Sequence, residues 1–154
     1  MECGDPVMRW AITTLLLAAS CLWPAAHAKN HSVVLITNDQ CPVSELTNLD
    51  IRKAYLGITV SVDGQAIRPL RMVGDPELDR VFFQTIVAMS EKSYERRALS
   101  LAIKFGTPRP AEHESLEQAL AALQRQSCGV LFLWAADVKM SHNTRTIKVL
   151  WQGN

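Results

Sequence analysis

One stretch of the sequence, residues 47–83, constrains the fold more than any other. At its centre the pair Asp63-Gly64 separates two runs rich in apolar and β-branched residues, which is the strongest short-range signal for a β-hairpin. The pair Asp75-Pro76 follows the second run. It is typical of a helix start, because aspartate caps the first turn and proline fits the first helical position. A short amphipathic helix precedes the hairpin. The stretch therefore predicts a helix, a hairpin and a second helix in succession.

Helical and strand-like patterns alternate along the rest of the chain. The first helix takes Thr47 or Asn48 as its N-cap and ends near Gly57, since glycine accepts the left-handed conformation that terminates many helices. Further helices are expected after the caps Ser90 and Ser115. Strands are expected over residues 32–37, 58–62, 65–73, 129–134 and 146–151. Strands that alternate with helices of about 10 to 15 residues predict an α/β sandwich.

The helix after Ser90 has two distinct faces in its sequence. Five apolar residues recur at helical spacing, which predicts that they pack on the core: Tyr94, Ala98, Leu101, Ala102 and Phe105. Charged residues lie between them and predict a solvated opposite face: Glu91, Lys92, Glu95, Arg96 and Arg97. Gly106 is expected to end this helix.

The central stretch also resembles a known family. A helix of the pattern L-x-x-x-x-(I/L)-R-x-x-(Y/F)-L-G, an Asp-Gly turn, an I-x-P strand and an R-x-F-F helix are similar to the substrate-binding proteins of phosphate ABC transporters, and most of all to their short single-lobe relatives. The matching residues are Leu46, Ile51, Arg52, Tyr55, Leu56, Gly57, Asp63, Gly64, Ile67, Pro69, Arg80, Phe82 and Phe83. The resemblance extends from Val33 to about Leu150. It implies one lobe of a type 2 periplasmic binding protein, a three-layer-like α/β sandwich with a mixed sheet flanked by helices.

The resemblance also implies where an anion would bind. In the family, hydroxyl groups and backbone N–H groups at a helix N-terminus hold phosphate, and such a helix start favours negative charge. The corresponding run here, Gly74 to Asp79, has no hydroxyl group and contains three carboxylates. We therefore expect this corner to disfavour phosphate, and we expect Arg68 and Arg71 to pair with its acids. The candidate ligand-binding side chains are Asn38, Ser44, Thr47, Arg68 and Arg71.

Residues 1–28 resemble a secretory signal peptide. Arg9 precedes an apolar run over residues 10–23, and Ala26-His27-Ala28 fits a cleavage site. The run is shorter than the roughly 20 apolar residues that a spanning helix needs, so that a membrane anchor is the less favoured alternative. The segment predicts export to the periplasm.

Export would leave residues 29–154 as a single periplasmic domain, and Met8 makes a better start for the signal peptide than Met1. Cys41 would follow the first strand of this domain and Cys128 would precede a later one. If these strands are antiparallel neighbours, the two cysteines meet, and an oxidising compartment favours a disulfide. The sequence is compatible with a disulfide between the two cysteines and with two buried free thiols.

Composition and motifs exclude several classes of function. A formal net charge of +1 is too small to indicate nucleic-acid binding. His31, His113 and His142 have no partner at metal-ligand spacing, so no metal is expected. There is no phosphate-binding glycine-rich loop and no G-x-S-x-G motif, and neither an enzyme activity nor a cofactor is expected.

Two hypotheses follow for a non-enzymatic periplasmic protein. The first is a solute-binding-like protein for phosphate or another small anion, which serves a membrane permease or a sensor protein. The alternative is a protein-interaction module that keeps the same scaffold without its small ligand.

Overall fold

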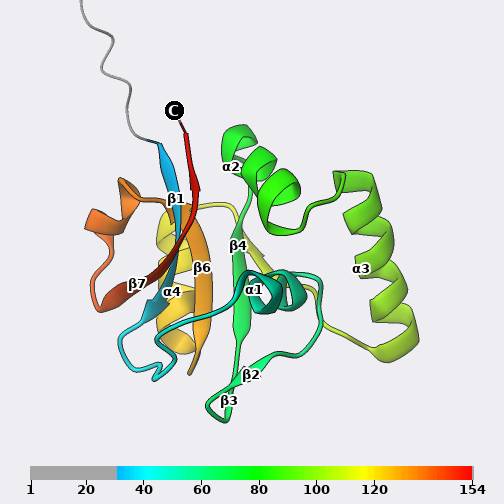
Figure 1. The fold of residues 1–154 in the computed structure, drawn as a ribbon, viewed down its shortest axis with the longest axis horizontal. Helices are drawn as coiled ribbons and strands as arrows, with labels where there is room; N and C mark the ends of the chain where they lie inside the picture. The colour runs from blue at the N-terminus through cyan, green and yellow to red at the C-terminus, as the bar shows by residue number, and fades with distance from the viewer. Residues whose placement is uncertain (1–30, 154) are drawn as a thin grey trace, which may run out of the picture.

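A five-stranded mixed β-sheet forms the centre of the molecule (Figure 1). The computed structural model describes residues 31–153. In spatial order the strands are β5 (Ala111–His113), β4 (Arg68–Met72), β6 (Gly129–Trp134), β1 (Ser32–Asn38) and β7 (Thr144–Gln152). β1 is antiparallel to both of its neighbours, whereas β4 is parallel to β5 and to β6.

Helices cover both faces of this sheet. They are α1 (Asn48–Tyr55), α2 (Pro76–Val81), the π-helical turn η1 (Phe82–Ile86), α3 (Glu91–Phe105), α4 (Leu116–Arg125) and the 3-10 turn η2 (Asp137–Met140). On one face, Leu123 of α4 packs in a core with Ile36 and Leu131 of the sheet. On the other face, α1, α2 and η1 share a core with Leu35 and Phe132. The three layers confirm the predicted α/β fold with a mixed sheet.

A cluster of buried aromatic rings fixes α1 and η1 against the sheet. The ring of Tyr55, at the end of α1, lies edge-on to Phe132 of β6 with the centroids 5.4 Å apart. Phe82 of η1 stacks flat on the same Phe132 ring at 5.3 Å. The Tyr55 hydroxyl donates to the carbonyl oxygen of Leu70 in β4 at 3.0 Å and lies 3.3 Å from that of Val130 in β6. One side chain thereby joins α1 to both parallel strands, and its burial raises the pKa of Tyr55 above the ordinary range.

The hairpin forms at the predicted turn, but it is much shorter than predicted. Its strands are β2 (Ser61–Val62) and β3 (Gln65–Ala66), which form a separate two-stranded sheet. Asp63 and Gly64 have φ angles of 52° and 75°, as a tight turn with positive φ at both central positions requires. Beyond this turn, the amide of Arg68 donates to the carbonyl oxygen of Cys128 at 2.9 Å. Pairing of β4 with β6 in the main sheet thus replaces the longer hairpin.

The prediction for α3 is wrong at the C-terminal end of its apolar stripe. Ser90 caps this helix and Gly106 ends it in the left-handed conformation, as predicted. Tyr94 is buried, but Phe105, which was expected to reach the core, is 73% exposed. Because α3 stands at the periphery of the molecule, only its first turns reach the core (Figure 1).

The sequence analysis did not identify the edge strand β5. Its residues, Ala-Glu-His, have low strand propensity and directly follow a loop with two prolines. Parallel pairing with β4, from Leu70 opposite Ala111 to Met72 opposite His113, sets the extended conformation. Pairing with a distant strand therefore overrides local propensity here.

The predicted signal segment, residues 1–28, lies outside the described residues, as do the alternative starts Met1 and Met8. Within residues 31–153, the structure contains no helix with the length and apolar character that crossing a membrane requires.

Cys41 and Cys128 are joined by a disulfide in the structure, with Sγ atoms 2.08 Å and Cα atoms 4.9 Å apart. Antiparallel pairing of β1 with β6 brings the residues after β1 close to those before β6. Both cysteines are buried. The bond crosses 87 positions of sequence and ties the loop after β1 to the start of β6.

We expect the disulfide to stabilise the folded chain by about 2–4 kcal/mol, because a cross-link over a long loop restricts the unfolded state. The double variant C41A/C128A should lose this free energy of unfolding in a urea titration. A reductant should lower the stability of the wild-type protein to that of the variant and leave the variant unchanged. A wild-type urea midpoint that is insensitive to reductant would contradict the prediction.

Candidate functional site

The candidate site lies where the parallel strands β4 and β6 end. Carboxyl ends of neighbouring parallel strands meet at one edge of a sheet, and ligands of open α/β sheets bind outside that edge. β4 leads through Gly74, with a φ of 95°, to Asp75 at the start of α2. β6 runs parallel to β4 and ends at Trp134. The site therefore combines the N-terminus of α2 with the last side chain of β6.

The carboxylate of Asp75 occupies the N-terminus of α2. Its Oδ1 accepts hydrogen bonds from the backbone amides of Glu77 at 3.0 Å and Leu78 at 3.1 Å. Its Oδ2 accepts a hydrogen bond from the indole Nε1 of Trp134 at 2.7 Å. Pro76, the first residue of the helix, has no N–H to offer. The donors that an anion would need at this helix start are thus used by the chain's own carboxylate.

These hydrogen bonds determine the charge state of Asp75. Partial burial disfavours the charged form of the carboxyl group, but the hydrogen bonds from Trp134 and from the amides of Leu78 and Glu77 outweigh it. The pKa of Asp75 is therefore held below its ordinary value of 3.8. The helix start carries a fixed negative charge at neutral pH.

Acidic and aromatic side chains surround Asp75. The ring of His31 lies 5.4 Å from that of Trp134, and its Nδ1 lies 4.0 Å from the carboxylate of Glu77, a side chain that is 60% exposed. Trp151 of β7 lies on another side of Trp134, with ring centroids 6.1 Å apart. Two like unit charges about 4 Å apart near a protein surface repel each other by about 4 kcal/mol. The corner is therefore better suited to a hydrogen-bond donor or a cation than to phosphate.

Arg71 of β4 is buried and paired, as the sequence predicts. Its Nη2 lies 2.6 Å from Oδ1 of Asp79, and its Nη1 lies 3.2 Å from Oε1 of Glu112 on β5. Its guanidinium carbon also lies 4.3 Å from the centroid of the Phe82 ring. Only 6% of the side chain is exposed. The guanidinium of Arg71 is thus paired with two carboxylates and packed on an aromatic ring, and it is not free to bind an anionic ligand.

Asn38 and Arg68 lie at the amino ends of the parallel strands β4 and β6, at the other end of these strands from Asp75. Arg68 is opposite Gly129, the first residue of β6, and Asn38 ends β1 at the same edge. Arg68 is exposed, and the predicted pairing with acids is not found for it among residues 31–153. It lines an open groove together with Gly57, Thr107, Pro108, Arg109 and Gln126.

The hydrogen-bonding groups of Asn38 are used within the protein. Its side-chain amide donates to the carbonyl oxygens of Leu123 at 3.1 Å and Gln126 at 2.6 Å, at the end of α4, and its Oδ1 accepts from the amide of Cys41. Ser44 is exposed in the loop before α1. Thr47 is the N-cap of α1. The structure therefore does not bring the five candidate residues together in one site.

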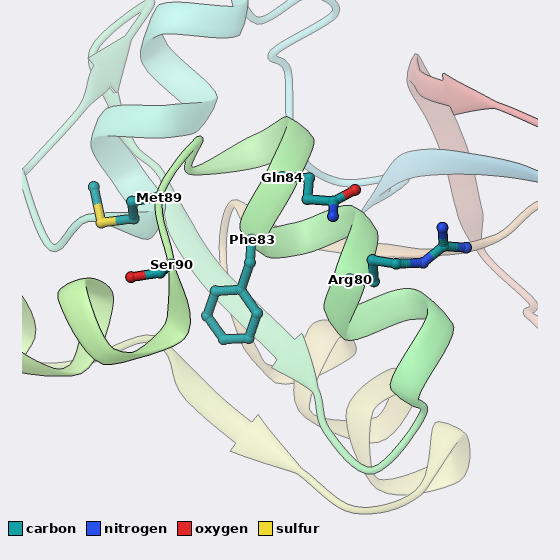
Figure 2. A pocket seen from close by; sticks show the side chains of 5 residues that line it. All are labelled: Arg80, Phe83, Gln84, Met89 and Ser90. Atoms are coloured by element: carbon teal, nitrogen blue, oxygen red, sulfur yellow. The ribbon is translucent and has the colours of Figure 1, made fainter.

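A shallow hollow lies on the outer side of α2 and η1 (Figure 2). Figure 2 shows the side chain of Phe83 between those of Ser90 and Arg80, with Gln84 and Met89 at the border. Phe83 and Met89 are half-buried and apolar, whereas the other three side chains are polar. An apolar floor with a polar rim suits the side chain of a protein partner better than a small anion.

No metal site is found in the part of the chain that the structure describes. Residues 31–153 contain no group of three or more His, Cys, Asp or Glu side chains that could hold a metal ion.

Trp134 is the site residue that sequence reasoning missed. The sequence suggests a buried strand aromatic, or else an exposed residue of a partner surface, at this position, whereas the half-buried indole donates to Asp75. Its place at the carboxyl end of a strand indicates that Trp134 can contribute to a ligand site. This indication points to Asp75 only once β4 is known to be the neighbour of β6, and local sequence does not give the order of strands.

No protein-family model matches the chain, and no curated protein matches it in sequence. Among solved structures, it is similar to an ABC-type phosphate transport receptor from Vibrio cholerae, with a TM-score of 0.54 and 16% identity over 77% of this chain and 46% of that one. A putative phosphate ABC transporter substrate-binding protein with bound phosphate from Clostridium perfringens gives a TM-score of 0.48 and 16% identity, over 75% of this chain and 53% of that one.

The comparison with the receptor from Vibrio cholerae confirms the resemblance at the level of the fold. The chain shares the fold of part of this transport receptor. It spans about half the length of each of the two structures. Since fold does not carry function by itself, the ligand has to be argued from the site.

The variant D75N keeps a capping side chain but removes the charge and one of the two acceptor oxygens. We expect a loss of about 1–2 kcal/mol in the free energy of unfolding near neutral pH, since one set of hydrogen bonds is lost. Because the folded pKa is depressed, the stability contributed by the Asp75 charge is complete above the ordinary pKa of 3.8 and is lost as the pH falls through the folded pKa. Urea titrations between about pH 7 and pH 2 measure this. A wild-type advantage over D75N that stays constant down to the lowest pH would contradict it.

Arg71→Ala should lower the free energy of unfolding by about 2–4 kcal/mol, because it leaves Asp79 and Glu112 without their buried partner and removes the packing on Phe82. Arg68→Ala is the matched control on the same strand. Its side chain is exposed, and the expected change is within about 0.5 kcal/mol. Equal urea midpoints for the two variants would contradict the role given to Arg71.

Proposed function

We propose that this chain is a non-enzymatic recognition protein of the periplasm that uses the scaffold of a phosphate-receptor lobe to bind a partner protein in place of free phosphate. The observation that carries the proposal is the carboxylate of Asp75 at the N-terminus of α2, hydrogen-bonded to two backbone amides and to Trp134. A phosphate ion at this place would compete with a tethered negative charge for the same donors.

A protein partner meets no such obstacle. Glu77 pairs with Arg80 at 3.7 Å but remains 60% exposed, so that lysine, arginine or backbone N–H groups of the partner can also reach its carboxylate. Apolar side chains of the partner can fill the hollow at Phe83. Such a surface combines charged and apolar groups at one end of the molecule, as protein interfaces do. A permease or a membrane sensor protein is the class of partner we propose, since the structure with the similar fold is a transport receptor.

Export to the periplasm is part of the proposal. It is supported by the signal-like segment over residues 1–28 and by the bonded pair Cys41 and Cys128, because disulfides persist in oxidising compartments. The mature chain would then be a single domain over residues 29–154.

Binding of a small anion is the second candidate function. The observation that favours it is the likeness in fold to a phosphate transport receptor. In this case the anion would use other groups than the start of α2. The exposed candidates are Ser44, Thr47 and Arg68.

A thermal-shift and calorimetry panel with phosphate, sulfate and organic anions at millimolar concentration tests the proposal. A ligand at about 100 times its Kd stabilises the folded state by about 2.7 kcal/mol, which raises Tm by at least about 5 °C for a domain of this size. We expect no such rise for the wild-type protein with any of these anions. A rise with phosphate would establish the second candidate function and overturn the first.

The variant D75S tests the cause. It replaces the carboxylate with a hydroxyl group and keeps a good N-cap, so that phosphate should stabilise D75S but not the wild-type protein. The control D39S removes an exposed carboxylate from the loop after β1 and should not gain phosphate binding. If D75S and D39S behave alike, Asp75 is not the group that excludes the ion.

A further inference from the structure

Helix α3 is held to the rest of the molecule by one of its sides only. Tyr94 is the one buried residue of its fifteen, and the Tyr94 hydroxyl donates to the carbonyl oxygen of Tyr55 at 3.1 Å. Ala98 and Leu101 lie on the same side and border a narrow space together with Gly57 and Pro108. Figure 1 shows α3 at the edge of the molecule, with its other side turned away from the sheet.

The side turned away from the body carries exposed apolar residues. At 3.6 residues per turn, Leu99 and Ile103 point about 140° and 180° away from Tyr94. Leu99 is 53% exposed and Ile103 is 75% exposed. These are two of the large hydrophobic side chains that the described part of the chain leaves in contact with solvent. The charge pattern predicted a solvated polar face here, and exposed apolar side chains are not expected on such a face.

Basic side chains accompany this apolar face. Lys92 and Arg96 share it by helical spacing, because Lys92, Arg96, Leu99 and Ile103 follow each other at intervals of three and four residues. Arg97 and Lys104 lie on one flank of the helix, and within residues 31–153 none of the four basic residues makes an ion pair. The helix has two acidic residues, and one of them, Glu95, is held by Arg109 at 2.6 Å.

The charge and apolar character of this face indicate what binds to it. In a dimer in which α3 met α3, the same unpaired cations would lie opposite each other and repel. The surface of an anionic bilayer offers phosphate groups for the cations and acyl chains for Leu99 and Ile103, and basic amphipathic helices bind such surfaces. We propose that α3 docks the protein on an anionic phospholipid membrane, with Leu99 and Ile103 inserted at the headgroup level and Lys92 and Arg96 on the lipid phosphates.

Hydroxyl-radical footprinting of the full chain with phospholipid vesicles tests this proposal at the helix itself, so that membrane contact through any other part of the chain does not count as binding. Vesicles of phosphatidylglycerol and phosphatidylcholine should reduce the oxidation of Leu99 and Ile103 at least about threefold, and added salt should reverse the effect. Vesicles of pure phosphatidylcholine should not protect them. Met140, which is 68% exposed on η2, serves as the internal control and should remain unprotected.

Two sets of variants at exposed positions complete the test. K92E/R96E should lose the protection by phosphatidylglycerol, since each basic residue near an anionic membrane contributes about a fivefold factor in binding. The control K139E changes a lysine of η2 and should keep the protection. L99S/I103S lacks the residues whose oxidation is measured, so its binding to the same vesicles is compared with that of the wild-type protein by sedimentation. It should fall, because binding strength scales with the apolar area that is buried.

Three results would overturn the proposal. The first is equal oxidation of α3 with and without phosphatidylglycerol. The second is protection that K92E/R96E retains. The third is protection that rises with protein concentration in the absence of vesicles, which would assign the face to a second copy of the chain.

Discussion

The hydrogen bonds accepted by Asp75 determine both the structure and the chemistry of the sheet edge where the candidate site lies. α2 has only six residues, so that its first turn is most of the helix and its cap decides whether the helix forms at that place. The same carboxylate accepts from Trp134 and so fixes the end of β6 relative to the end of β4. One side chain thus replaces the bound ion that would otherwise satisfy the amides of this helix start.

Arg71 has the complementary role on the inner side of this corner. Its two carboxylate partners come from α2 and from the edge strand β5, and its flat face lies on Phe82. A buried cation is tolerated because opposite charges and an aromatic face surround it. The charge of Arg71 is therefore balanced within the chain. The chain shares the fold of part of a phosphate transport receptor, while the charged groups around Arg71 serve the protein's own packing.

Local sequence predicts the parts of this fold that depend on local physics. The sequence predicts the N-caps Asp75, Ser90 and Ser115 and the turn at Asp63-Gly64, and it narrows the first cap to Thr47 or Asn48, of which Thr47 is the cap. Capping and tight turns need only neighbouring residues. The length of the hairpin and the existence of β5 were not, because pairing with distant strands sets them. The candidate site shows the same difference between local and distant interactions. The acidic start of α2 is evident from the sequence, whereas the hydrogen bond of Asp75 to Trp134 depends on β6 being the neighbour of β4.

The openness of the site also bears on the kind of ligand. Within residues 31–153 no second lobe lies over the carboxyl edge of β4 and β6, so a small anion bound there would stay in contact with water. Charge interactions in water are about twentyfold weaker than in a dry protein interior. A ligand that supplies its own cover avoids this loss, because it excludes water from Asp75, Trp134 and the hollow at Phe83 as it binds. The proposed protein partner is large enough to do so, whereas a free ion is not.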